Sequence, residues 1–167
     1  DVEGEIVFTQ EPPITGIPDY QMNYIIISPD DRFAFVAGTH GNIVSIPLYI
    51  DNPEAYVLSV PGSSNARTQL TLAPDGSHFI YSIISGTSRN PRRIDILPDG
   101  TLVDGDVFMS RPSGTCFTAF SPLGNYLVLT QYSNVNRVYT YNDGVYTLLH
   151  SSFPGITTYL RNIIFVD

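Results

Sequence analysis

The sequence has no lysine and no tryptophan, and it has a single cysteine, Cys116, among its 167 residues. One cysteine excludes an internal disulfide framework and a cysteine-rich zinc site. All eight basic residues are arginines, against 16 acidic residues, so the net charge is −8. Because binding to a phosphate backbone needs clustered positive charge, we do not expect nucleic acid as a partner. No apolar run approaches the ~20 residues of a membrane span, so we expect no membrane span.

What the sequence does contain favours β-strands. Apolar residues make up 43% and charged residues 14%, a balance that excludes a disordered chain. The 11 tyrosines and 9 phenylalanines, together with many β-branched residues, are typical of strands. No stretch of about a dozen residues has a helical period without a proline or glycine to break it. We therefore predict an all-β chain.

Three segments of the sequence superpose on one another. Each contains an apolar strand, a small residue followed by proline, a polar turn and a second apolar strand. The segments are residues 24–38, 69–83 and 117–131. A fourth copy begins at Asn162 and stops at Phe165. The repeat is therefore the organising feature of the chain.

Two further strands follow in each segment. The predicted third strands are residues 42–48, 92–97 and 136–141, and the predicted outer strands are residues 55–60, 101–109 and 145–150. Turns such as Asn142-Asp143-Gly144 separate them, and glycine there tolerates a positive φ without steric cost. Four strands in every ~40–50 residues are typical of β-propeller blades.

The repeat carries a resemblance to a known family. Residues 121–129 (SPLGNYLVL), followed by residues 136–141 and the Asn142-Asp143-Gly144 turn, resemble the repeat of WD40-like and lactonase-like (YVTN-type) β-propellers. Residues 73–76 (APDG) and 28–31 (SPDD) match the same turn. The resemblance spans almost the whole chain and implies a propeller. Lactonase-like families also have acidic, Asn and Arg or His residues around the central channel, but none of these carries over to a particular residue here.

We predict about three and a half four-stranded antiparallel blades, which form one β-propeller region within a larger ring. Residues 1–22 hold the outer strand of a preceding blade, at residues 5–10, and a connection. Blades occupy residues 23–67, 68–114 and 115–160, and residues 161–167 hold the first strand of a following blade. Propellers have typically 4–8 blades, so the rest of a longer chain or self-association would complete the ring. A compact β-sandwich made of the same strands is the alternative fold.

The sequence offers no catalytic or metal-binding motif. A glycine-rich phosphate loop, a G-x-S-x-G elbow and an HExxH motif are all missing. His40, His78 and His150 fall at three different places in the repeat, so they predict no common metal site, and we interpret them as surface or edge residues. Asp residues in the turns are interpreted as turn formers. We predict no catalytic residue, no metal and no cofactor, and activity as an enzyme is not expected.

One connection stands out as a binding candidate. Residues 85–93 gather Arg89, Arg92 and Arg93 in an otherwise acidic chain. Arginines in a loop on the rim can pair with a carboxylate or phosphate group, so we predict these three as a partner-binding site.

The function that we infer from the sequence is a non-enzymatic module for interaction and assembly. It would be a structural component of a larger complex, such as a virion or cell-surface structure, with protein partners. The alternatives are a fragment of a lactonase-like or other hydrolytic propeller enzyme, and a compact β-sandwich binding domain. The sequence leaves the cellular compartment open.

Overall fold

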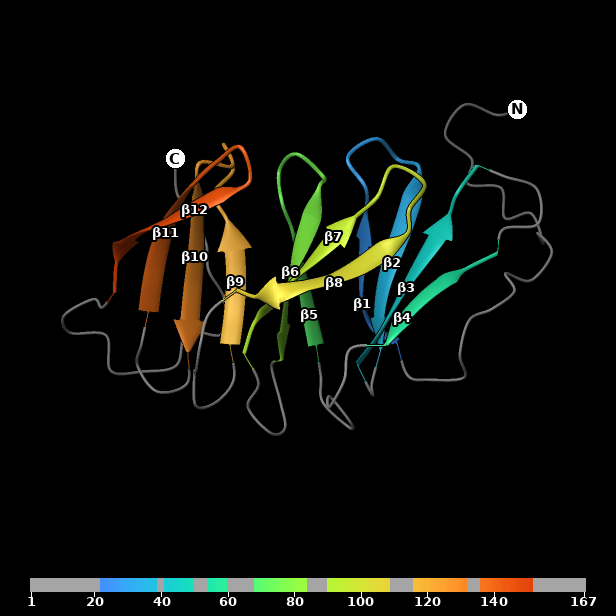
Figure 1. The fold of residues 1–167 in the computed structure, drawn as a ribbon, viewed down its shortest axis with the longest axis horizontal. Coiled ribbons are helices and arrows are strands. Elements are labelled where there is room, and N and C mark those ends of the chain that lie inside the picture. The colour runs from blue at the N-terminus through green and yellow to red at the C-terminus, as the bar shows by residue number, and fades with distance from the viewer. Residues whose placement is uncertain are drawn as a thin grey trace, which may run out of the picture.

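The described part of the chain forms three four-stranded antiparallel sheets that stand side by side (Figure 1). The structure is a computed structural model, and it describes residues 22–38, 41–49, 54–59, 68–83, 90–108, 116–131 and 136–151. Within these ranges there is no α-helix, and so no helix long enough to cross a membrane. The predicted all-β architecture of four-stranded units is confirmed. The compact sandwich is wrong, because the strands form three separate sheets and not two facing ones.

Each sheet is a meander in which the strands pair in chain order. Blade 1 contains β1 (Met22–Ile27), β2 (Phe33–Gly38), β3 (Asn42–Pro47) and β4 (Tyr56–Ser59). Blade 2 contains β5 (Thr68–Leu72), β6 (His78–Ile83), β7 (Arg92–Ile96) and β8 (Leu102–Val107). Blade 3 contains β9 (Cys116–Phe120), β10 (Tyr126–Gln131), β11 (Asn136–Asn142) and β12 (Val145–His150).

The turn between the first and second strands is the same in all three blades. Its first residue donates its N–H to the carbonyl five positions later and accepts an N–H from three positions later, at 2.8–2.9 Å. The turns start at Ser28, Ala73 and Ser121, and the residues with positive φ are Asp31, Gly76 and Gly124. Pro29, Pro74 and Pro122 follow the first residue of each turn, so their predicted equivalence is confirmed.

Successive turns also pack against one another. A Cβ at Gly124 would lie 2.6 Å from Cγ of Pro74, and a Cβ at Gly76 would lie 3.1 Å from Cδ of Pro29. The glycine of each of these turns therefore lies against the proline of the preceding turn. The repeated motif thus sets the distance between blades as well as the shape of the turn.

Apolar side chains fill the space between neighbouring blades. Because side chains alternate along a strand, Phe79 of β6 packs towards blade 1, whereas the next residue, Ile80, packs towards blade 3. The rings of Phe35 and Phe79 meet edge to face with their centroids 4.7 Å apart. Leu127 and Leu129 of blade 3 pack with Ile80 between blades 2 and 3.

The first strands lie next to one another, since β5 contacts both β1 and β9, while β4 contacts β8 (Figure 1). In β1, however, Ile25 and Ile27 are 64% and 44% exposed. The equivalent Leu70 is buried and Leu72 is half-buried, because they face blade 1. The predicted terminal strands at residues 5–10 and 162–165 lie outside the described residues, so these strands and the blade boundaries stay predictions.

Candidate functional site

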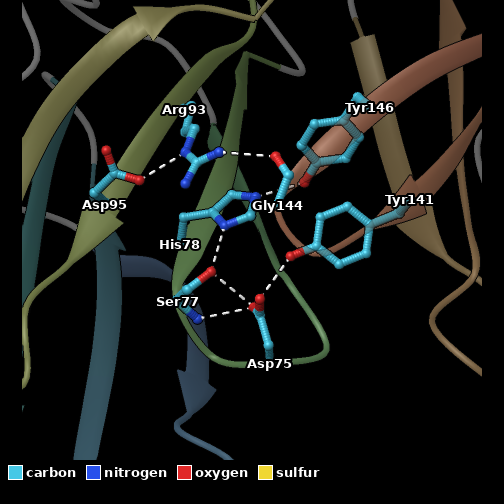
Figure 2. Close-up of polar contacts among 8 residues, drawn as sticks. All are labelled: Asp75, Ser77, His78, Arg93, Asp95, Tyr141, Gly144 and Tyr146. Carbon is cyan, nitrogen blue, oxygen red and sulfur yellow. Dashed lines mark hydrogen bonds and ion pairs between the residues drawn. The ribbon is translucent and has the colours of Figure 1, made fainter.

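A polar cluster joins blades 2 and 3 beside their turns (Figure 2). We name it the blade 2–3 junction and define it as Asp75, Ser77, His78, Tyr141 and Tyr146. The turn before β6 supplies Asp75 and Ser77, and His78 is the first residue of β6. A two-residue hairpin at Asp143 and Gly144, both with positive φ, sets Tyr141 of β11 directly opposite Tyr146 of β12.

The hydrogen bonds of the junction lead to the carboxylate of Asp75 from two sides, one through Tyr141 and one through Tyr146, His78 and Ser77. The Tyr141 hydroxyl donates to Asp75 Oδ2 at 2.7 Å. The Ser77 N–H and hydroxyl both donate to Asp75 Oδ1, at 3.0 and 2.8 Å. Since the Ser77 proton is used there, its Oγ accepts from His78 Nδ1 at 2.7 Å. His78 Nε2 then accepts from the Tyr146 hydroxyl at 2.5 Å, so the contacts assign a neutral Nδ1–H imidazole.

Burial decides the charge state of this cluster. His78 has no exposed surface, and burial lowers the pKa of its imidazole to about 4. Burial also raises the pKa of Tyr141 to about 12 and moves the pKa of Tyr146 above its usual value. Partial burial alone would raise the pKa of Asp75, but hydrogen bonds from Tyr141 and Ser77 outweigh it and lower that pKa. Asp75 is therefore the one charged member at neutral pH.

The junction does not have the geometry of a catalytic triad. In a triad the histidine lies between the serine and the carboxylate, whereas here Ser77 lies between Asp75 and His78. No substrate reaches the imidazole, because His78 is completely buried. The cluster binds two blades together. The interpretation of His78 as a surface or edge residue is wrong, because its side chain is completely buried and bonds Tyr146 of blade 3.

The predicted arginine site is only partly described. Arg92 and Arg93 do not belong to a loop, because β7 begins at Arg92. Arg92 forms a bidentate pair with Asp104 at 2.8 and 2.9 Å. Arg93 pairs with Asp95 at 2.6 Å and donates to the carbonyl of Gly144 in blade 3 at 3.2 Å (Figure 2).

These contacts show that both guanidinium groups interact within the chain. Arg89 lies outside the described residues. Binding of a partner by Arg89, Arg92 and Arg93 stays a prediction.

A hollow of about 210 Å³ lies at the equivalent position between blades 1 and 2. Its lining combines apolar side chains with two carboxylates and one guanidinium. The lining includes Pro29, Asp30, Arg32, Phe33, Ile96, Leu97 and Pro98. No group of three or more His, Cys, Asp or Glu residues in the described ranges is arranged to hold a metal ion.

Comparisons with solved structures identify proteins of the same fold. A candidate 6-phosphogluconolactonase from Bacteroides uniformis is 22% identical, with a TM-score of 0.65 over 81% of this chain. A second, from Bacteroides fragilis, is 18% identical with a TM-score of 0.59 over 77% of the chain. A protein from Lactobacillus plantarum is also 18% identical, with a TM-score of 0.59 over 78% of the chain.

At these identities the comparisons show a lactonase-like β-propeller fold and nothing finer. The chain spans 37–41% of the length of the three structures. The sequence matches no protein-family model. It also has no match among curated proteins.

The comparisons correct our main functional inference. Two of the three structures are candidate lactonases, so they favour the hydrolytic alternative over a non-enzymatic module for interaction and assembly. Nothing among them supports a virion or cell-surface setting. The module for interaction and assembly is therefore not retained.

Proposed function

We propose that this chain is part of a lactonase-like β-propeller hydrolase that opens a sugar lactone, and that its repeat is of the YVTN type. The observation that carries the proposal is the match in fold to candidate 6-phosphogluconolactonases over about four fifths of the chain. The turn that starts at Ser28, Ala73 and Ser121 supports the assignment of the repeat. The proposed substrate class is a phosphorylated aldonolactone.

The proposed reaction is hydrolysis of a lactone by one water molecule. Water adds to the lactone carbonyl, the bond from that carbon to the ring oxygen breaks, and a hydroxy acid forms that releases one proton at neutral pH. The junction residues act as the rigid frame in this proposal. Binding and chemistry belong to loops on such a frame, and the proposal assigns no catalytic role to His78 or Asp75.

Proton release measures this activity directly. The complete protein that contains this chain should accelerate hydrolysis of 6-phosphogluconolactone above the spontaneous rate, and should act more slowly on the unphosphorylated lactone. The matched control is the same preparation after thermal unfolding. Rates equal to buffer with both lactones, from protein shown to be folded, would contradict the proposal.

Completion of the ring belongs to the same proposal. We propose that further chain, or a second copy, packs on the face of blade 1 that carries Ile25 and Ile27, because these apolar side chains are exposed there. Solution mass compared with the length of the full coding sequence separates the two cases. A stable monomer of the complete protein with both side chains still exposed to solvent would overturn this part.

A further inference from the structure

The two junctions between blades are built on equivalent positions. In blade 3, Tyr141 lies opposite Tyr146 across the hairpin. In blade 2, the residues at the corresponding positions are Ile96 and Leu102, which also lie opposite each other. Both Ile96 and Tyr141 donate their backbone N–H to the turn residue just before the second strand, at 2.8 Å. Between blades 1 and 2, the smaller aliphatic residues Ile96 and Leu102 thus take the positions that Tyr141 and Tyr146 have between blades 2 and 3.

The turn carboxylates of Asp30 and Asp75 accept equivalent hydrogen bonds at Oδ1. Asp75 Oδ1 accepts the N–H of Ser77, two residues later, and Asp30 Oδ1 accepts the N–H of Arg32 at 3.3 Å. A serine hydroxyl also donates to each Oδ1, from Ser77 at 2.8 Å and from Ser28 at 2.6 Å. The second oxygen differs. Asp75 Oδ2 binds the phenol of Tyr141, whereas Asp30 Oδ2 faces the guanidinium of Arg32 at 3.2 Å.

The hollow between blades 1 and 2 borders the position that corresponds to the Tyr141 ring. Ile96 contributes to its wall, and Pro29, Leu97 and Pro98 supply further apolar surface. The guanidinium of Arg32 lies 5.0 Å from the centroid of the Phe33 ring. The same guanidinium donates to the carbonyl of Pro98. The space therefore combines apolar walls, a cationic edge and a carboxylate oxygen.

We propose that this hollow binds a phenol ring, whose hydroxyl donates to Asp30 Oδ2 as the Tyr141 hydroxyl donates to Asp75. The carboxylate oxygen has a second lone pair free for this bond. The Arg32–Asp30 pair does not block it, because both side chains are more than half exposed and such surface pairs contribute little. Arg32 can instead lie against the bound ring as a cation–π partner.

A phenol fits this site better than a purely apolar ring does. The hydroxyl gains a charge-assisted hydrogen bond that an unsubstituted ring lacks. The ligand is either a free phenolic compound or a tyrosine side chain of another polypeptide, since both present the same group. The site is independent of lactone hydrolysis, so failure of either proposal leaves the other intact.

Titration with p-cresol, the analogue of a tyrosine side chain, tests the site in the complete protein that contains this chain. We expect saturable NMR shifts at Leu97, which lines the hollow, and at Gly100, which lies against the ring of the lining residue Phe33. Toluene, which lacks only the hydroxyl, should bind at least about tenfold more weakly, because a hydrogen bond to a charged group is lost. Equal shifts with p-cresol and toluene, or shifts confined to other blades, would overturn the proposal.

Three variants locate the site. Asp30→Asn should weaken p-cresol binding about tenfold, whereas Asp99→Asn, on a neighbouring turn outside the lining, should leave it unchanged. Ile96→Tyr should fill the hollow from within and abolish binding. If the Ile96 variant does not fold, the Asp30 and Asp99 pair still decides. Unchanged affinity in Asp30→Asn refutes the assigned oxygen and the proposal.

A peptide Gly-Tyr-Gly separates the two sources of the ring. Binding of the peptide at least as tightly as p-cresol supports a tyrosine of another polypeptide. Binding of p-cresol without binding of the peptide supports a free phenol. Failure of both ligands to bind rejects the site.

Discussion

The charge of His78 links the pH of the solution to the contact between blades 2 and 3. The imidazole is neutral when folded, with a pKa of about 4, and its ordinary value is 6.5. Between these values the unfolded chain binds more protons than the folded chain, so stability falls as the pH is lowered from 6.5 to 4. Below pH 4 His78 is protonated in both the folded and the unfolded chain, so it adds no further change of stability with pH.

We therefore expect the free energy of unfolding to decrease by up to about 3 kcal/mol across this window, as measured by urea unfolding at several pH values. His78→Phe, which places there the residue found at Phe33 in blade 1, should remove that slope. Asp75 contributes mainly below this window, because its pKa is lowered from an ordinary value of 3.8. An unchanged slope in the variant would show that other groups cause the acid sensitivity.

Gly124 is required by both its backbone and its neighbour. It has a φ of 75°, and a Cβ there would lie 2.6 Å from Cγ of Pro74. A left-handed non-glycine residue costs roughly 1–2 kcal/mol, and the contact adds to that cost. We expect Gly124→Ala to destabilise the chain more than Gly76→Ala, whose Cβ would meet Pro29 at 3.1 Å.

Denaturant midpoints of the two glycine variants measure the difference. Asp31→Gly is the matched opposite, because Asp31 already has a φ of 57° at the equivalent position. This variant should be slightly stabilised. Equal losses in both alanine variants would mean that the turns do not press on one another.

Among single residues, the sequence predicted the turns but not the junction. The prolines and glycines of the turns act through local backbone geometry, which a short motif reveals. The contacts of His78 are set by packing between blades, and its tyrosine partners come from a distant hairpin. Two signals were available in the sequence. Ser77 and His78 follow the turn aspartate Asp75, and Tyr141 and Tyr146 flank an Asp-Gly turn.

At the scale of elements, the Gln69 side chain of β5 forms hydrogen bonds with the open edge of β9. Its amide donates to the carbonyl of Thr118 and accepts the N–H of Thr118, both at 3.2 Å. These backbone groups of β9 point away from β10, so the side chain caps the open edge of the strand. Thr71 adds a hydroxyl bond to the same carbonyl at 3.0 Å.

Removing that cap should loosen β9 locally. Gln69→Met keeps the size of the side chain but loses both bonds, and we expect a loss of about 1–3 kcal/mol, because the Thr118 N–H is left without its partner. Hydrogen exchange at Thr118 should accelerate, while exchange at Phe35 of blade 1 should not. Slow exchange at Thr118 in the variant would show that the side-chain bonds contribute little.

Strand positions were largely predictable, because alternating apolar residues and turn signals act locally. The expected third strand at residues 92–97 corresponds to β7, which ends at Ile96. The predicted arginine loop overlapped that strand, since a polar run hides where strand pairing begins. β7 starts at Arg92, which pairs with Val107 of β8, while the Arg92 side chain bonds Asp104.

In the whole molecule, each blade is coupled to its neighbours mainly through the junctions and the apolar faces. Repeat architectures of this kind are stabilised by contacts between adjacent units. The blade 2–3 junction contributes buried hydrogen bonds that an apolar interface lacks. Opening of blade 3 should therefore depend on Tyr141 and Tyr146 much more than opening of blade 1 does.

The double variant Tyr141→Phe, Tyr146→Phe tests this coupling, because it removes both hydroxyls and leaves His78 Nε2 buried without a donor. An unpaired buried acceptor costs about 1–3 kcal/mol, so amides of Leu127 and Leu129 in β10 should exchange about tenfold faster or more. The amide of Phe35 in β2 should keep its rate. Tyr126→Phe is the control, since Tyr126 is 44% exposed. Equal acceleration in blades 1 and 3 would mean that the chain opens as one unit and that the junction stabilises all blades alike.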